Sequence, residues 1–219
     1  MPVKLNHYWT INPIKAKDYN QFILKEFIPG VNRLGMHTVA GWAVLVGEYS
    51  DIIFETVTND LELLEKAMRN PNYQKLKQSL LQFIKSYKTK VLVQTDKVNA
   101  YSTDLHEDTV KFNQMWDVVS AKQEDFDQFT TQEFYPLLEK LGIVVANEWE
   151  VLIGDGPRII CEGRATDIRS MISNLQSKKF RRALTELKNY VENYRSRILS
   201  FHIQKIKGYK SASYNLVLQ

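Results

Sequence analysis

The sequence predicts an α+β fold in which one βαββαβ unit is written twice. Residues 5–94 match residues 112–201 without a gap at an offset of 107 positions. Roughly twenty of about ninety aligned positions are identical, well above chance. All four tryptophans lie at matching positions of the two copies, as the pairs Trp9–Trp116 and Trp42–Trp149. Within each copy, the hydrophobic pattern changes between the two-residue period of strands and the 3.6-residue period of helices.

The first half of a copy has the pattern of a strand, a helix and a strand. Residues 5–11 are bulky and alternate between two side-chain sets, which predicts a strand. Residues 16–34 place apolar side chains near helical spacing, and Pro29 is expected to kink this helix or end its regular part. Residues 37–46 form the next predicted strand, and Gly47 opens a turn.

The second half of a copy has the pattern of a strand, a helix and a strand again. Residues 52–57 are rich in β-branched and aromatic side chains, as strands are. Residues 59–60 (Asn-Asp) can cap a helix that begins near Leu61. Proline at position 71 excludes helical geometry at residue 70, so the helix is interrupted there. Residues 90–94 are predicted to be the last strand.

The order βαββαβ is that of the ferredoxin-like unit, whose sheet has one face without helices. This bare face must be buried against another surface, and the second copy supplies one. We therefore expect two tandem ferredoxin-like repeats packed sheet to sheet as an intramolecular barrel with helices outside. The expected boundaries are residues 1–96 for the first repeat, 97–110 for a linker, 111–201 for the second repeat and 202–219 for a C-terminal tail.

The composition narrows the class of protein. The chain has 219 residues, of which 44% are hydrophobic and 25% are charged, as in soluble globular proteins. It has no apolar run near the ~18 residues of a membrane span, and its start lacks a secretory signal. A net charge of +4 does not by itself indicate nucleic-acid binding. The single cysteine suits a reducing compartment. We expect a cytoplasmic protein that binds neither membrane nor nucleic acid, and the sequence allows a homodimer.

Three segments of the first copy resemble a known family. Residues 42–48 (Trp-Ala-Val-Leu-Val-Gly-Glu), 51–53 (Asp-Ile-Ile) and 70–73 (Asn-Pro-Asn-Tyr) are similar to the Trp…Gly-Glu…Val-Val…Pro-Glu-Trp pattern of the NIPSNAP family. The resemblance spans nearly all of the first copy and is looser in the second. It implies the dimeric α/β barrel architecture, which the antibiotic biosynthesis monooxygenases share, and it implies no defined activity.

The polar residues of that family are replaced in this chain. The family's His and Trp on the third strand correspond to Phe54 and Thr56, and in the second copy to Cys161 and Gly163. Its Arg and Tyr on the first strand correspond to His7 and Trp9, and in the second copy to Gln114 and Trp116. An activity of the family therefore does not transfer directly to this chain.

The predicted ligand-binding residues are His7, Trp9, Phe54, Gln114 and Trp116. If their strand faces point into the barrel, they line a cavity of mixed polarity, as ligand pockets often do. The alternative is that the tryptophans simply fill the barrel. The leading hypothesis is a protein that binds a small, partly apolar ligand in the barrel cavity. A cofactor-independent monooxygenase-like enzyme using the same cavity, and an interaction protein acting through its outer helices, are the alternatives, so enzymatic activity is left open.

Other candidates have simpler explanations. Asn6 and Asn113 occupy equivalent positions and match a residue type that such oxygenases use, but Asn6 alternates away from His7 and Trp9 on its strand. The paired acidic residues are Glu26 with Glu133 on helices and Glu55 with Glu162 on the third strands. A surface or capping role is expected for them rather than acid–base chemistry, although a strand glutamate that faces inward would be of more interest. Cys161 is expected to be a buried, inert thiol.

Two charged stretches are candidates for a metal site and for a surface that binds an anionic partner. The acidic cluster at residues 104–108 contains one histidine and has no standard metal-ligand spacing. The basic stretch at residues 178–210 suits a solvated face, although it can meet an anionic partner. No metal or cofactor motif is present in the sequence, and neither is expected.

Overall fold

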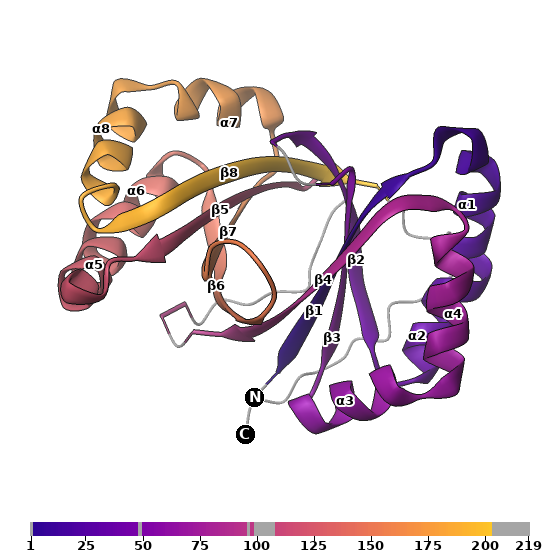
Figure 1. Ribbon diagram of the computed structural model, residues 1–219. Helices are drawn as coiled ribbons and strands as arrows, with labels where there is room; N and C mark the ends of the chain where they lie inside the picture. Colours follow the sequence, from indigo (N-terminus) through magenta and orange to yellow (C-terminus); the bar gives the residue numbers. More distant parts are fainter. Residues whose placement is uncertain (1, 48–49, 96, 99–107, 203–219) are drawn as a thin grey trace.

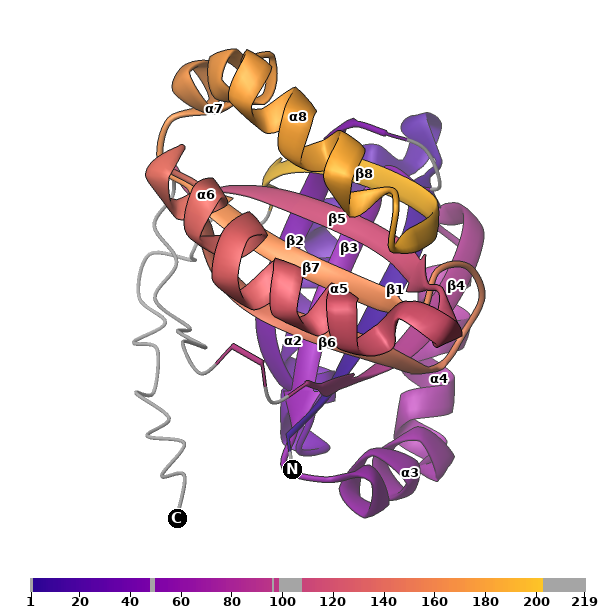
Figure 2. The same cartoon turned by 90° about the vertical axis from the view of Figure 1, so that its left-hand side faces the viewer.

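The computed structural model describes residues 2–47, 50–95, 97–98 and 108–202 (Figure 1). Eight strands close into one barrel in the order β1-β3-β2-β8-β5-β7-β6-β4. The helices lie on the outside, and Figure 2 shows those of the second copy covering the outer face of its strands. The predicted fold class, two tandem ferredoxin-like repeats forming an intramolecular dimeric α/β barrel, is confirmed.

The two halves contain the same elements in the same order. The first half consists of β1 (Val3–Ile11), η1 (Pro13–Lys15), α1 (Ala16–Phe22), the π-helical turn η2 (Ile23–Phe27), α2 (Ile28–Arg33), β2 (His37–Val46), β3 (Ile52–Thr58), α3 (Leu61–Arg69), α4 (Pro71–Leu81) and β4 (Ile84–Gln94). The second half consists of β5 (Val110–Val118), η3 (Ser120–Lys122), α5 (Gln123–Phe129), the π-helical turn η4 (Thr130–Phe134), α6 (Tyr135–Lys140), β6 (Val144–Ile153), β7 (Ile159–Ala165), α7 (Ile168–Leu175), α8 (Lys178–Leu187) and β8 (Val191–Phe201). Within the described ranges, no helix has the length and apolarity needed to cross a membrane.

Strand pairing repeats at the same offset as the sequence. His7 pairs with Phe54 between β1 and β3, and Gln114 pairs with Cys161 between β5 and β7. The two halves join through equivalent contacts, β2 with β8 and β4 with β6. The register therefore has the pseudo-twofold relation that the ungapped repeat predicts.

The helix predicted over residues 16–34 continues through its proline. Because Pro29 lacks an N–H group, it cannot donate to the preceding turn of a regular α-helix. The preceding π turn accommodates this, since the Ile28 N–H donates to the Ile23 carbonyl five residues back. The second half repeats the device before its proline, with the Tyr135 N–H donating to the Thr130 carbonyl.

The last strand of the first copy is longer than predicted. β4 begins at Ile84 instead of Lys90, and it pairs with β1 as far as Ile11. The added residues include the exposed Lys85 and Lys88, whose charge hides the strand pattern in the sequence. The predicted interruption at Asn70 is confirmed, because α3 ends at Arg69 and the Asn70 side chain caps α4.

Candidate functional site

The predicted site residues of the first half lie between its sheet and its helices. The rings of His7 and Trp9 each lie 6.1 Å from the ring of Phe27 in the helix layer. Phe54 lies 5.7 Å from both. The expectation that this strand face points into the barrel is wrong, because the odd-numbered side chains of β1 form the apolar core that the helices cover.

The predicted site residues of the second half lie in a separate core. The Tyr194 hydroxyl donates to Gln114 Oε1 at 2.9 Å, and the Tyr194 ring stacks on Trp116 at 6.4 Å. Trp116 also packs against Phe126 of α5. The structure thus brings together His7, Trp9 and Phe54 in one half and Gln114 and Trp116 in the other. Ligand contact with these residues stays a prediction.

His7 is buried with one ring nitrogen bonded. Nδ1 lies 2.8 Å from the Tyr87 hydroxyl, and Nε2 has no hydrogen-bond partner within the described part of the chain. Burial, with a smaller effect from the charge of Lys77, lowers the pKa of His7 to about 3. The imidazole is therefore neutral at physiological pH.

We expect His7 to make the protein less stable as the pH falls from about 6.5 towards 3, because the unfolded histidine takes up a proton in this range and the folded one does not. Substitution His7→Gln, which introduces the residue of the second half, should reduce this dependence. Urea unfolding at pH 7 and pH 5 measures the effect, and NMR of the ring identifies its protonation state. A His7 ring that titrates near its ordinary pKa would contradict the expectation.

The other face of the strands points into the barrel, and four of its buried charged side chains, those of Lys4, Lys111, Glu55 and Glu162, form one cluster. Lys4 Nζ lies 2.6 Å from Glu162 Oε1, and Lys111 Nζ lies 2.8 Å from Glu55 Oε1. Two longer ion pairs of 3.4 Å and 3.1 Å complete the cluster. Burial alone would raise the pKa of Glu162, but the charges of Lys111 and Lys4 outweigh burial and hold this pKa well below its usual range. Both glutamates therefore face inward, and their charges are matched by lysines.

Two tryptophan rings pack against the lysines of this cluster. Lys4 Nζ lies 4.5 Å from the ring centre of Trp149, and Lys111 Nζ lies 4.7 Å from that of Trp42. Each lysine thus contacts a glutamate and a tryptophan of the opposite half. Both tryptophans are buried, in equivalent places of the two halves. The centre of the lumen is occupied by side chains that join the two halves.

The asparagines of the first strands lie in this lumen layer. Asn6 pairs in register with Glu55, and Asn113 pairs with Glu162. Their Oδ1 atoms have no hydrogen-bond partner in the ranges that the structure covers. Because Asn6 and His7 point to opposite faces of β1, the structure does not assemble a joint Asn–His–Trp site.

A buried acid in the second half was not predicted. Glu148 on β6 is 0% exposed, and its Oε2 accepts a hydrogen bond from the Tyr135 hydroxyl. Its Oε1 accepts from Thr95 Oγ1 at 3.0 Å and lies 3.3 Å from Lys97 Nζ. A buried carboxylate is costly unless it is paired, and these contacts pair it.

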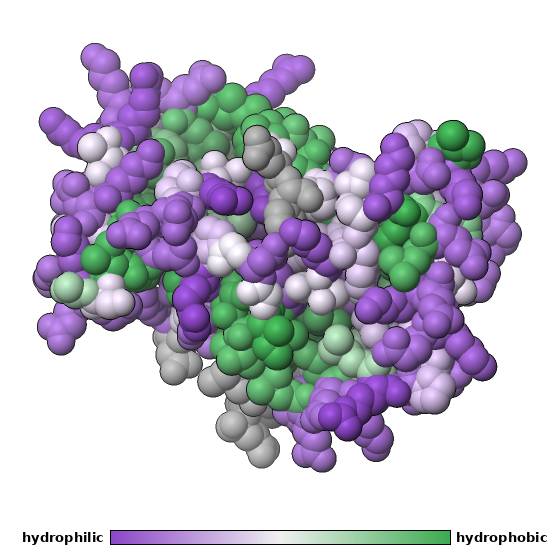
Figure 3. Space-filling view, in the orientation of Figure 1, coloured by the Kyte–Doolittle hydropathy of each residue, from purple (hydrophilic) through white to green (hydrophobic). Residues whose placement is uncertain are grey.

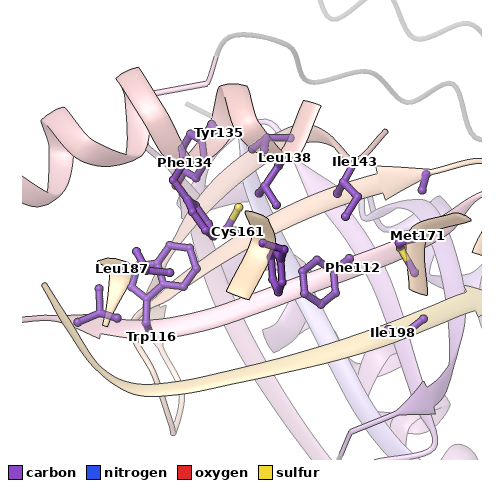
Figure 4. Close-up of a cluster of buried hydrophobic side chains, with 14 of the residues drawn as sticks. Phe112, Trp116, Phe134, Tyr135, Leu138, Ile143, Cys161, Met171, Leu187 and Ile198 are labelled. Atoms are coloured by element: carbon purple, nitrogen blue, oxygen red, sulfur yellow. The ribbon is translucent and has the colours of Figure 1, made fainter. Parts of the chain in front are cut away.

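A small cavity of about 220 Å³ opens beside this acid. Tyr135 and Lys97, both partners of Glu148, line it, together with Val98, Thr131, Pro136, Glu139 and Val145. Figure 4 shows Tyr135 and Phe134 reaching from the helix layer above the strand that carries Cys161. Burial, followed by the influence of the neighbouring Cys161 and Glu148, raises the pKa of Tyr135 well above its usual value. The tyrosine is therefore held protonated and donates to the carboxylate.

The first half lacks this polar set at the matching positions. Tyr135 corresponds to Ile28, and Glu148 corresponds to Gly41. The fold is therefore complete without the acid. Cys161, which corresponds to Phe54, is buried as expected, and burial raises the pKa of its thiol. Positions at which the two copies differ in chemistry are the sequence signal that would have located this set.

The remaining candidates do not form a site. Glu26 and Glu133 are exposed on their helical turns, as expected. Residues 104–107 of the acidic cluster and residues 203–210 of the basic stretch lie outside the described residues, as do most of the linker and tail. Among the described residues, no group of three or more His, Cys, Asp or Glu side chains is placed to hold a metal ion.

Comparisons with known proteins extend these observations. No protein-family model and no curated protein matches the chain. An anthrone oxidase-like protein of known structure matches 97% of this chain and 95% of its own, with a TM-score of 0.63 and 13% identity. A candidate monooxygenase from Fusobacterium nucleatum matches 91% of this chain and 92% of its own, with a TM-score of 0.62 and 11% identity. At these identities the likeness shows the fold.

A NIPSNAP family protein from Agrobacterium tumefaciens was also found. It matches 44% of this chain and 95% of its own, with 18% identity and a TM-score of 0.37. The matched portion has the length of about one half of the barrel. The fold-level resemblance to the dimeric α/β barrel group is confirmed by the two full-length matches above, the anthrone oxidase-like protein and the candidate monooxygenase.

Proposed function

We propose that this protein binds a small, partly apolar ligand in the cavity beside Tyr135, and that the Tyr135–Glu148 pair exchanges a proton with it. The observation that carries the proposal is a fully buried carboxylate, bonded to a tyrosine on a cavity wall, at positions where the other half has Gly41 and Ile28. A group such as Tyr135, whose pKa is raised well above its usual value beside a cavity, is typical of functional sites. This location differs from the barrel lumen of the initial hypothesis, because tryptophans and paired charges occupy the lumen centre.

The cavity wall suits a ligand with one polar end. Val98, Pro136 and Val145 offer apolar contacts, and Tyr135 and Lys97 offer a hydroxyl and an ammonium group. A ligand hydroxyl that meets the Tyr135 oxygen can pass a proton through the tyrosine to Glu148. The reverse transfer protonates a ligand oxygen, so the pair supports general acid–base chemistry.

We expect Tyr135→Phe to weaken the binding of a phenolic probe, 2-naphthol, by roughly tenfold, because one hydrogen bond to the ligand is lost. Titration followed by NMR of the backbone amides measures the affinity. The matched control is Tyr194→Phe, since Tyr194 bonds Gln114 in the same half and does not line the cavity. The proposal would be wrong if wild type and Tyr135→Phe bound 2-naphthol with equal affinity. It would also be wrong if 2-naphthol shifted only amide signals of residues far from Tyr135.

A second candidate is a cofactor-independent monooxygenase-like enzyme at the same cavity. The acid–base pair favours it, because a positioned carboxylate and hydroxyl can remove a proton from a substrate. The similar structures named as an anthrone oxidase-like protein and a candidate monooxygenase suggest the test substrate. Dioxygen uptake with anthrone should exceed the background rate and fall in Glu148→Gln. Uptake equal to that without protein would leave ligand binding as the sole proposal.

A further inference from the structure

A groove on the outer surface of the second half is lined by both apolar and charged side chains. It lies between the helical run α5–η4–α6 and α8, and its volume is about 920 Å³. Its apolar lining residues are Phe129, Pro136, Leu137 and Ala183. Its polar lining residues are Gln132, Glu133, Lys140, Lys178, Lys179, Arg182 and Glu186. Figure 3 shows hydrophilic side chains projecting from the end of the molecule that carries these helices, with apolar surface between them.

The first half fills the matching position by direct packing. Gly30 on α2 lies so close to α4 that an added Cβ would be 2.4 Å from Leu76 Cδ1. In the second half the matching residues are Leu137 on α6 and Ala183 on α8. The first half therefore has the small residue on α2 and the leucine on α4, whereas the second half has the leucine on α6 and the small residue on α8. Leu137 and Ala183 line the groove. The fold itself does not require this groove, because the first half packs tightly with the opposite choice.

The charge of the groove favours an anion. Four of its lining residues are cationic and two are carboxylates, so the lining carries a net charge of +2. Lys178, Lys179 and Arg182 are exposed on α8, and Lys140 is exposed at the end of α6. An apolar floor with a cationic rim complements a molecule that has an apolar chain and one negative group.

The size of the groove favours a small molecule over a protein partner. Its volume falls in the range of roughly 300–1,000 Å³ that is typical of small-molecule sites. Eleven residues line it, whereas a stable protein interface uses about 20–30 residues on each side. A single-chain amphiphile matches both the volume and the mixed lining.

We infer that this groove binds a single-chain anionic amphiphile of the fatty-acid class. The hydrocarbon chain lies over Phe129, Leu137 and Ala183, and the carboxylate is held by the cations of α8. The inference is independent of the proposed function, because Tyr135 and Lys97 do not line the groove. The two cavities share Pro136, so the variants that test the groove leave this residue unchanged.

Calorimetric titration with monomeric dodecanoate tests the inference. Ala183→Leu places the larger side chain of the first half on the groove floor, and Lys179→Glu with Arg182→Glu reverses two charges of the rim. Each variant should lose roughly tenfold or more in affinity. The matched control is Lys66→Glu with Lys75→Glu, the same charge change at exposed positions of α3 and α4. This control should bind as the wild type does, and circular dichroism checks that all variants fold.

Three results would overturn the inference. The first is unchanged dodecanoate affinity in the variants that fill the groove and reverse its charge. The second is equal affinity for dodecanol, which has the same chain without the charge. The third is binding to vesicles that contain phosphatidylserine without binding to monomeric dodecanoate, since this indicates a general attraction to anionic surfaces. Tyr135→Phe should leave dodecanoate affinity unchanged, so that failure of the groove and failure of the Tyr135 site are distinguishable.

Discussion

Replacement of Lys111 by alanine should lower the free energy of unfolding by about 3–5 kcal/mol, which is typical of breaking a buried ion pair. The variant leaves Glu55 without its partner at 2.8 Å and leaves one lysine, Lys4, between two buried glutamates. It also removes the cation from the face of Trp42. Urea unfolding measures the loss.

An exposed ion pair provides the control for this prediction. Lys88 lies 2.8 Å from Asp155, and both side chains are about half exposed. Lys88→Ala should therefore cost about 0–1 kcal/mol. If Lys111→Ala unfolds at the same urea concentration as Lys88→Ala, the buried cluster does not stabilise the barrel as described.

Replacement of Trp42 by alanine should also destabilise the protein by about 3–5 kcal/mol, because it empties a large volume in the lumen. Trp42 is fully buried and packs against Phe201 of the other half at a ring distance of 5.0 Å. Trp42→Phe keeps an aromatic face for Lys111 and should cost less. Thermal or urea unfolding of the three proteins gives the order, and a Trp42→Ala variant as stable as wild type would contradict the assignment.

A double-mutant cycle separates packing from the contact with the cation. Lys111 Nζ lies 4.7 Å from the Trp42 ring centre, so the two substitutions should not be additive. Trp42→Ala with Lys88→Ala should be additive, because Lys88 is exposed and pairs with Asp155. Additivity in both pairs would show that the lysine and the tryptophan act independently.

The fold follows from the sequence because the repeat contains long-range information. Periodicity alone predicts strands and helices. Two matching copies also predict that the chain contains two sheets, each with one uncovered face, and that these two faces can pack against each other. The alternation of side chains on β1 separates His7 from Asn6, but it does not say which set faces the lumen. Lys4 settles this in the structure through Glu162, which lies 158 positions away along the chain. Such a pairing has no local signal in the sequence.

The candidate site was missed for a related reason. Tyr135 and Glu148 lie on a helix and a strand that pack together, and Lys97 reaches them from beyond β4. None of these residues belongs to a recognisable motif. Their sequence signal is a contrast between the copies, such as Glu148 against Gly41, and a search for similarity passes over such contrasts.

The contacts across the lumen are reciprocal between the two halves, whereas Glu148 has no counterpart at the matching position, Gly41. In a barrel assembled from two identical chains, every side chain appears twice, and a buried acid introduced into one half is introduced into both. In this chain the symmetric pairs, such as Lys4 with Glu162 and Lys111 with Glu55, are kept where the halves meet. Glu148, which accepts a hydrogen bond from Thr95 beside the β4–β6 junction of the halves, is present once. Covalent joining of the copies therefore lets reciprocal pairs from both halves hold the barrel together, while Glu148 and the cavity beside it are present in the second half, once per barrel.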